Sequence, residues 1–98
     1  MTIEGFTSSL TQSKPPEGIS KLLQALWHDA KSNWLAAHDI AQEVETADGS
    51  WIHAYLHRKE GDPGNAAYWY RRAGKSMPST SLEAEWKEIA TELLKTKT

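Results

Sequence analysis

The chain contains no cysteine. It therefore has no disulfide framework, no thiolate metal site and no cysteine nucleophile, which fits a reducing compartment. No apolar run approaches the ~20 residues of a membrane-spanning helix, so we expect no membrane partner. Residues 1–20 carry neither the basic start nor the apolar segment of a secretory signal. We therefore expect a cytoplasmic protein of bacterial type.

An excess of charge of one sign is also missing. Eleven basic and 13 acidic side chains give a formal net charge of −2. This balance produces no strong field toward nucleic acid, which we do not expect as a partner. The cationic group Tyr68, Arg71, Arg72 and Lys75 is accordingly interpreted as a solvated helix face. A glycine-rich phosphate loop and a nucleophile–base arrangement are absent too, so the sequence predicts no catalytic residues.

What the sequence does contain is apolar residues at helical spacing. They recur every three or four positions in five segments, and no segment alternates with period two over the length of a strand. The predicted helices cover about 16–31, from the KSNW tetrad to about 46, 50–60, 63–77, and from 80 onward. The sequence thus predicts an all-α fold with four or five helices.

The N-terminal residues differ in composition from the rest. Residues 1–15 are rich in Ser, Thr, Gly and Pro, and we expect a flexible arm there. Ile3, Phe6 and Leu10 are the side chains through which this arm can dock. Residues 16–98 are then predicted to form a single helical domain.

Local signals set the expected helix boundaries. The tetrad ADGS at 47–50 is interpreted as a turn between two helices. Thr80 and Glu83 have the spacing of a capping box, which predicts the start of the last helix. Four of the five tryptophans are assigned to the core, where each indole N–H needs a partner; these are Trp27, Trp34, Trp69 and Trp86.

Two parts of the chain resemble each other at an offset of 29 residues. Each part reads as a helix, a short polar turn and a second helix. The matched pairs are Ala25 with Ala54, His28 with His57, and Ala37 with Ala66. Such a repeat predicts two stacked helical hairpins, which the last helix would cap at the C-terminus.

The second unit resembles a tetratricopeptide repeat. The residues that carry the resemblance are Ala54, Gly61–Asp62, Ala66, Tyr70, Ala73 and Pro78. It covers roughly residues 18–80, and it departs from the family where His53 and His57 replace its usual Leu and Tyr. The resemblance implies a non-catalytic module that binds a protein or peptide. Parts of the chain also resemble a group of small uncharacterised bacterial proteins, which implies no activity.

In the register of that family, four side chains would line a concave peptide-binding surface. They are Trp51, Tyr55, Arg58 and Lys59. Large aromatic side chains beside an arginine are typical of binding hot spots. The alternative is that Trp51 and Tyr55 belong to the core, because they share a helical arc with Ile52 and Leu56.

A histidine pattern supports a different class of function. His53 and His57 lie four residues apart, Glu60 follows three residues later, and His28 holds the matching place in the first unit. Imidazoles at this spacing share a helix face and can bind a divalent transition metal such as zinc. The alternative function is therefore a metal-binding protein or metal-dependent enzyme. Ordinary histidines, either solvated or buried with hydrogen bonds, explain the same pattern without any metal.

Self-association is a further expectation. Two stacked hairpins have two open ends, and one C-terminal helix covers only one of them. Ile19, Leu22 and Leu26 at the other end stay partly exposed unless the N-terminal arm covers them. We expect either docking of the arm or a weak homodimer, and favour the dimer.

Overall fold

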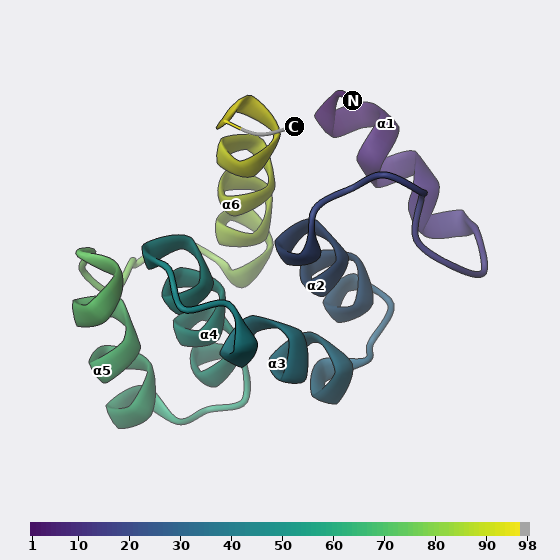
Figure 1. Ribbon diagram of the computed structural model, residues 1–98. Helices are drawn as coiled ribbons and strands as arrows, with labels where there is room; N and C mark the ends of the chain where they lie inside the picture. Colours follow the sequence, from purple (N-terminus) through teal and green to yellow (C-terminus); the bar gives the residue numbers. More distant parts are fainter. Residues whose placement is uncertain (97–98) are drawn as a thin grey trace.

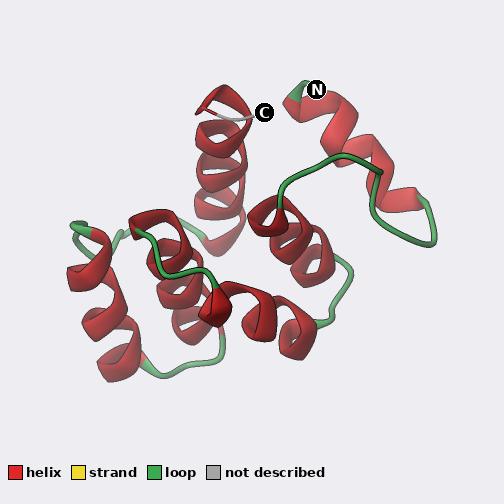
Figure 2. Ribbon diagram, in the orientation of Figure 1, coloured by secondary structure: helices red, strands yellow, loops and turns green. Residues whose placement is uncertain are grey.

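The computed structural model describes residues 1–96. In this part of the chain it contains six α-helices, one short 3-10 helix and no strand (Figure 1, Figure 2). The elements are α1 (Ile3–Ser8), η1 (Ser9–Thr11), α2 (Lys21–Ala30), α3 (Trp34–Glu43), α4 (Ala47–Lys59), α5 (Pro63–Ala73) and α6 (Leu82–Thr96). The all-α prediction is confirmed. Among the described residues, no helix has both the length and the apolar character needed to cross a membrane.

Helix α4 is the centre of the structure. It packs against α2, α3, α5 and α6, and Figure 1 shows it between α5 and α3. Every residue from Trp51 to His57 is buried. Because α4 is covered on all sides, it lacks the single apolar stripe of a surface helix, and its polar side chains also point at neighbouring helices.

Several helices begin at other residues than the sequence predicts. Helix α2 begins at Lys21 rather than near residue 16, because the Ser20 hydroxyl accepts the N–H of Leu23 at 3.2 Å. Helix α6 is capped by Ser81, whose hydroxyl accepts the N–H of Ala84 at 3.0 Å, and not by Thr80. The predicted capping box is therefore wrong by one residue.

The predicted turn at 47–50 is helical. Thr46 caps α4 by accepting the N–H of Gly49 at 3.0 Å, so these four residues form the first turn of the helix. A Cβ atom at Gly49 would overlap the backbone carbonyl of Val44. Because residue 49 is glycine, the short α3–α4 connection can pass close to the first turn of α4. This close approach keeps α3 packed against α4.

Helix α5 is shorter than the sequence predicts. It ends at Ala73, where Gly74 adopts a left-handed conformation with φ of 75°. This C-cap stops the helix before Met77, which is 39% exposed rather than on an apolar stripe.

The N-terminal arm contains the additional helix. Phe6 of α1 is fully buried and stacks on Trp86 of α6, with ring centroids 5.7 Å apart. The Trp27 indole donates to the Ser9 hydroxyl at 3.2 Å, and Lys31 donates to two backbone carbonyls of the arm. The structure therefore agrees with docking of the arm. The docked arm covers apolar surface whose exposure was the reason for expecting a dimer. The weak homodimer stays a prediction.

Candidate metal centre

Three histidines meet on the side of α4 that faces α3 and α5. His53 and His57 are one turn apart on α4, and α3 contributes His38. One ring nitrogen of each lies within 4.8 Å of the other two. The ring centroids are 4.6 Å apart for His38 and His53, 4.9 Å for His53 and His57, and 5.2 Å for His38 and His57. We call these residues the three-histidine site.

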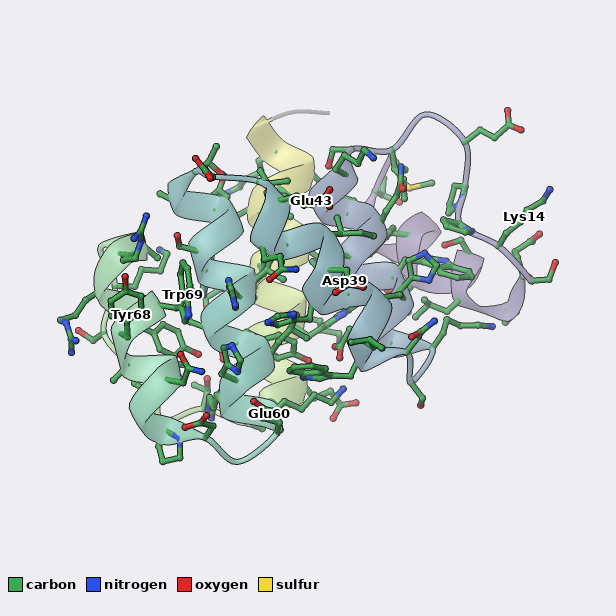
Figure 3. The ribbon with its side chains drawn as sticks, turned by 60° about the horizontal axis from the view of Figure 1, so that its bottom comes forward. Lys14, Asp39, Glu43, Glu60, Tyr68 and Trp69 are labelled. Carbon is green, nitrogen blue, oxygen red and sulfur yellow. The ribbon has the colours of Figure 1, made fainter. Side chains whose placement is uncertain are left out.

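Two tryptophans form the walls of this site. Trp34 stacks on His38 at 4.8 Å, and Trp69 stacks on His53 at 3.9 Å. Figure 3 shows Trp69 reaching from α5 toward α4. The Trp34 indole is held in place because its N–H donates to the carbonyl of Leu56 at 2.9 Å. Both tryptophans are only partly buried, whereas the sequence assigns them to the core together with the buried Trp27 and Trp86.

The histidines differ in their hydrogen bonds. His57 Nδ1 lies 2.7 Å from the Glu60 carboxylate, so this nitrogen carries the proton and Nε2 is left as a ligand atom. Within the described chain, His38 and His53 have ring contacts but no hydrogen bond. His53 is only 6% exposed. In residues 1–96, every fully enclosed side-chain nitrogen or oxygen has a hydrogen-bond partner, so the unpaired ring nitrogens of His53 are accessible to solvent. Accessible ring nitrogens without a protein partner are available to an external ligand.

The environment keeps His38 and His53 neutral. Burial, with a smaller contribution from the neighbouring His38 and His57, lowers the pKa of His53 to about 4. Burial also lowers the pKa of His38 below its usual value, with His57 acting in the same direction. The neutral imidazole is the form that binds a metal ion.

The structure separates one predicted metal residue from the others. His28 lies on α2, with its ring edge-on to Trp27 at 5.4 Å, and it belongs to no group of potential ligands in the described chain. The sequence repeat aligns the helix of His28 with α4, but the helix that packs on the histidine side of α4 is α3. His38 was missed for this reason, although its spacing from Trp34 places both on one helix face.

Glu60 lies next to the site, as the sequence suggests. It is the C-cap residue of α4 (Figure 3). Its carboxylate accepts the hydrogen bond from Nδ1 of His57. His57, Glu60 and Asp62 form a second group of possible ligands. The carboxylate of Asp62 already accepts the N–H of Asn65 as the N-cap of α5, at 3.3 Å. The first group is therefore the better candidate.

The four residues of the expected peptide surface lie elsewhere on α4. Trp51 Nε1 donates to Glu85 at 3.1 Å, and Arg58 Nη1 donates to the same carboxylate at 2.7 Å. Those two residues thus bind α6. The remaining pair, Tyr55 and Lys59, donates to the buried Asp29 of α2 at 2.8 and 2.9 Å. All four therefore contact internal acids, and Tyr55 and Lys59 also line a cavity of about 330 Å³ together with residues of α1, α2 and α6. The peptide-binding surface stays a prediction.

Comparison with known proteins adds no relative. None of the family models, curated proteins or solved structures compared with the chain matches it. The resemblance to tetratricopeptide repeats therefore has no independent support, and the three-histidine site is the feature of the molecule that bears on function.

Proposed function

We propose that this protein binds a divalent transition-metal ion through His38, His53 and His57. The observation that carries the proposal is the convergence of three imidazoles from two helices, with one nitrogen of each within 4.8 Å of the others. Imidazole ligands suit zinc, copper and nickel, whereas calcium and magnesium prefer oxygen atoms.

Packing alone is a poor explanation for this cluster. Stacked rings fill space, but an apolar ring would do so equally well and would bring no ring nitrogen without a protein partner into the cluster. His53 and His38 have only ring contacts in the described chain, and a metal ion would supply the missing partner. Glu60 supports the same interpretation, because metal-binding histidines commonly donate their other nitrogen to a carboxylate.

Three protein ligands leave one position of a tetrahedral ion free. Catalytic zinc sites share this arrangement, whereas structural sites close all four positions. The proposal is therefore for a site that can accept an external fourth ligand. The peptide-binding role gains no comparable support, because Trp51 and Tyr55 are buried and paired with internal carboxylates.

Thermal unfolding with and without Zn²⁺ or Ni²⁺ at pH 7.5 tests the proposal. An ion that binds only the native state, present at a free concentration 100 times its dissociation constant, raises the free energy of unfolding by about 2.7 kcal/mol. We expect a clear rise in Tm that His53→Ala abolishes and that is lost only as the pH falls toward 4, where the His53 imidazole takes up a proton.

The matched control is His28→Ala. This histidine lies on α2, outside the three-histidine site, so the variant keeps the metal-induced rise in Tm. Absence of any rise in the unmodified protein contradicts the proposal. An equal rise in His53→Ala contradicts it as well, because the ion would then bind elsewhere.

A further inference from the structure

A polar cavity lies beside the three-histidine site. Its volume is about 240 Å³, and His53 and Trp69 form part of its wall. The other lining residues are Ala41, Gln42, Val44, Glu45, Ser50 and Arg72, from the end of α3, the α3–α4 connection, α4 and α5. A molecule in this cavity would therefore lie against one of the proposed metal ligands.

The cavity contains a cation without an acidic partner. Arg72 lies over the Trp69 ring, with its guanidinium carbon 5.2 Å from the ring centroid, and its Nη1 donates to the Tyr68 hydroxyl at 3.2 Å. Among the described residues, no carboxylate is within ion-pair distance of Arg72. These contacts orient the guanidinium and leave its charge unneutralised, which favours binding of an anion.

The proposed metal ion would favour the same kind of ligand. Three neutral imidazoles do not reduce the double positive charge of a divalent ion, and the free coordination position is available to an anion. We propose that the cavity binds a small carboxylate, which coordinates the ion in the three-histidine site and pairs with Arg72. This inference rests on the metal-binding function proposed above. The polar groups of Gln42 and Ser50 supply further hydrogen-bonding positions in the same wall.

One lining residue opposes this ligand. Glu45 is exposed and carries a negative charge into the same cavity wall. Its carboxylate repels the proposed ligand and lowers its affinity, although solvent screens the effect. The substitution Glu45→Gln therefore tightens binding of the carboxylate, whereas loss of the Arg72 charge weakens it.

Cobalt(II) provides the test, because its visible spectrum reports the ligands of the bound ion. The protein is first titrated with Co²⁺ and then with acetate, with acetamide as a neutral control of similar shape. We expect acetate to change the visible bands and acetamide to leave them unchanged. Because charge-assisted pairs are the stronger hydrogen bonds, Arg72→Gln should weaken acetate binding about tenfold.

Arg71→Gln is the matched control, since Arg71 is the exposed neighbour on α5 and does not line the cavity. It should bind acetate like the unmodified protein. Arg72→Lys, which keeps the charge but not the planar fork, should fall between the two, and far-ultraviolet circular dichroism checks that each variant is folded.

The outcomes separate the two proposals. If Co²⁺ fails to bind the unmodified protein, the metal-binding function is wrong and the carboxylate site falls with it. If Co²⁺ binds but acetate leaves its spectrum unchanged, only the carboxylate inference is overturned. Equal acetate affinities in Arg72→Gln and Arg71→Gln also overturn it, because Arg72 would not be the partner.

Discussion

The two sides of helix α4 differ in whether their polar groups have hydrogen-bond partners. The acid-paired side, formed by Trp51, Tyr55, Arg58 and Lys59, matches each polar head to the carboxylate of Asp29 or Glu85. The imidazole side, formed by the three-histidine site, stacks rings and leaves two of its imidazoles without hydrogen bonds. A fully satisfied network fixes a structure, whereas an unsatisfied one of this kind is open to a ligand.

The acid-paired side joins three helices to α4. Glu85 is 1% exposed and accepts the Tyr70 hydroxyl at 2.7 Å in addition to Trp51 and Arg58. Burial raises the pKa of Tyr70, and the hydrogen bond to Glu85 raises it further. Burial and the charge of Asp29 likewise raise the pKa of Tyr55. Both phenols therefore remain protonated and continue to donate to the two acids.

The largest effect is expected where this network is broken. Glu85→Ala leaves the guanidinium of Arg58 without its carboxylate, and it removes the acceptor for Trp51 and Tyr70. Removal of one partner of a buried ion pair typically costs about 3–5 kcal/mol, so the free energy of unfolding in urea should fall by that amount. Glu88→Ala, at an exposed position of the same helix, is the control and should change stability little. Equal losses in both variants would show that the acid-paired side contributes no special stability.

The sequence predicts the helices better than their ends. Apolar spacing identifies the helical segments because burial of one face follows directly from residue order. The first residues of the helices are harder to predict, because several nearby residues can act as the N-cap. Ser20 caps α2 in place of a start at the prolines 15–16. Ser81 caps α6 in place of Thr80. Tertiary packing decides between such neighbours. Local order carries little information on that packing.

The same distinction applies to the side chains around α4. The pair His53 and His57 is visible in the sequence, because both lie on one helix. Their partner His38 is supplied by the packing of α3 against α4. The hydrogen bonds from Tyr55 to Asp29 and from Trp51 to Glu85 span 26 and 34 residues, so no local pattern reveals them.

A smaller effect is expected on the imidazole side when the pH falls. The pKa of His53 is about 4 in the folded protein, below its ordinary value of 6.5. Between these values the unfolded chain binds a proton that the folded protein does not, so the free energy of unfolding decreases as the pH falls from 6.5 to 4. One pKa unit corresponds to about 1.4 kcal/mol, and we expect a total loss of about 1–3 kcal/mol.

Urea unfolding in the presence of a chelator measures this loss without bound metal. His53→Gln cannot take up the proton, so its stability should depend less on pH over the same range. His28→Gln, on the other side of the structure, keeps the original dependence. If His53→Gln and the unmodified protein lose equal stability between pH 6.5 and 4.5, burial of His53 is not the cause.

The smallest effect is expected within the acid-paired side itself. Lys59 donates to Asp29 at 2.9 Å, but its side chain is 38% exposed, so water and salt screen this pair. In Lys59→Met the buried Asp29 keeps its hydrogen bond from Tyr55, and the aliphatic part of the side chain still packs. We expect the free energy of unfolding to fall by about 1 kcal/mol or less. Added salt should make the difference between the variant and the unmodified protein smaller still. Urea unfolding at low and high salt measures it. A loss as large as that of Glu85→Ala would mean that the ion pair of Asp29 contributes as much stability as that of Glu85. The exposure of Lys59 would then not explain any difference between the two ion pairs.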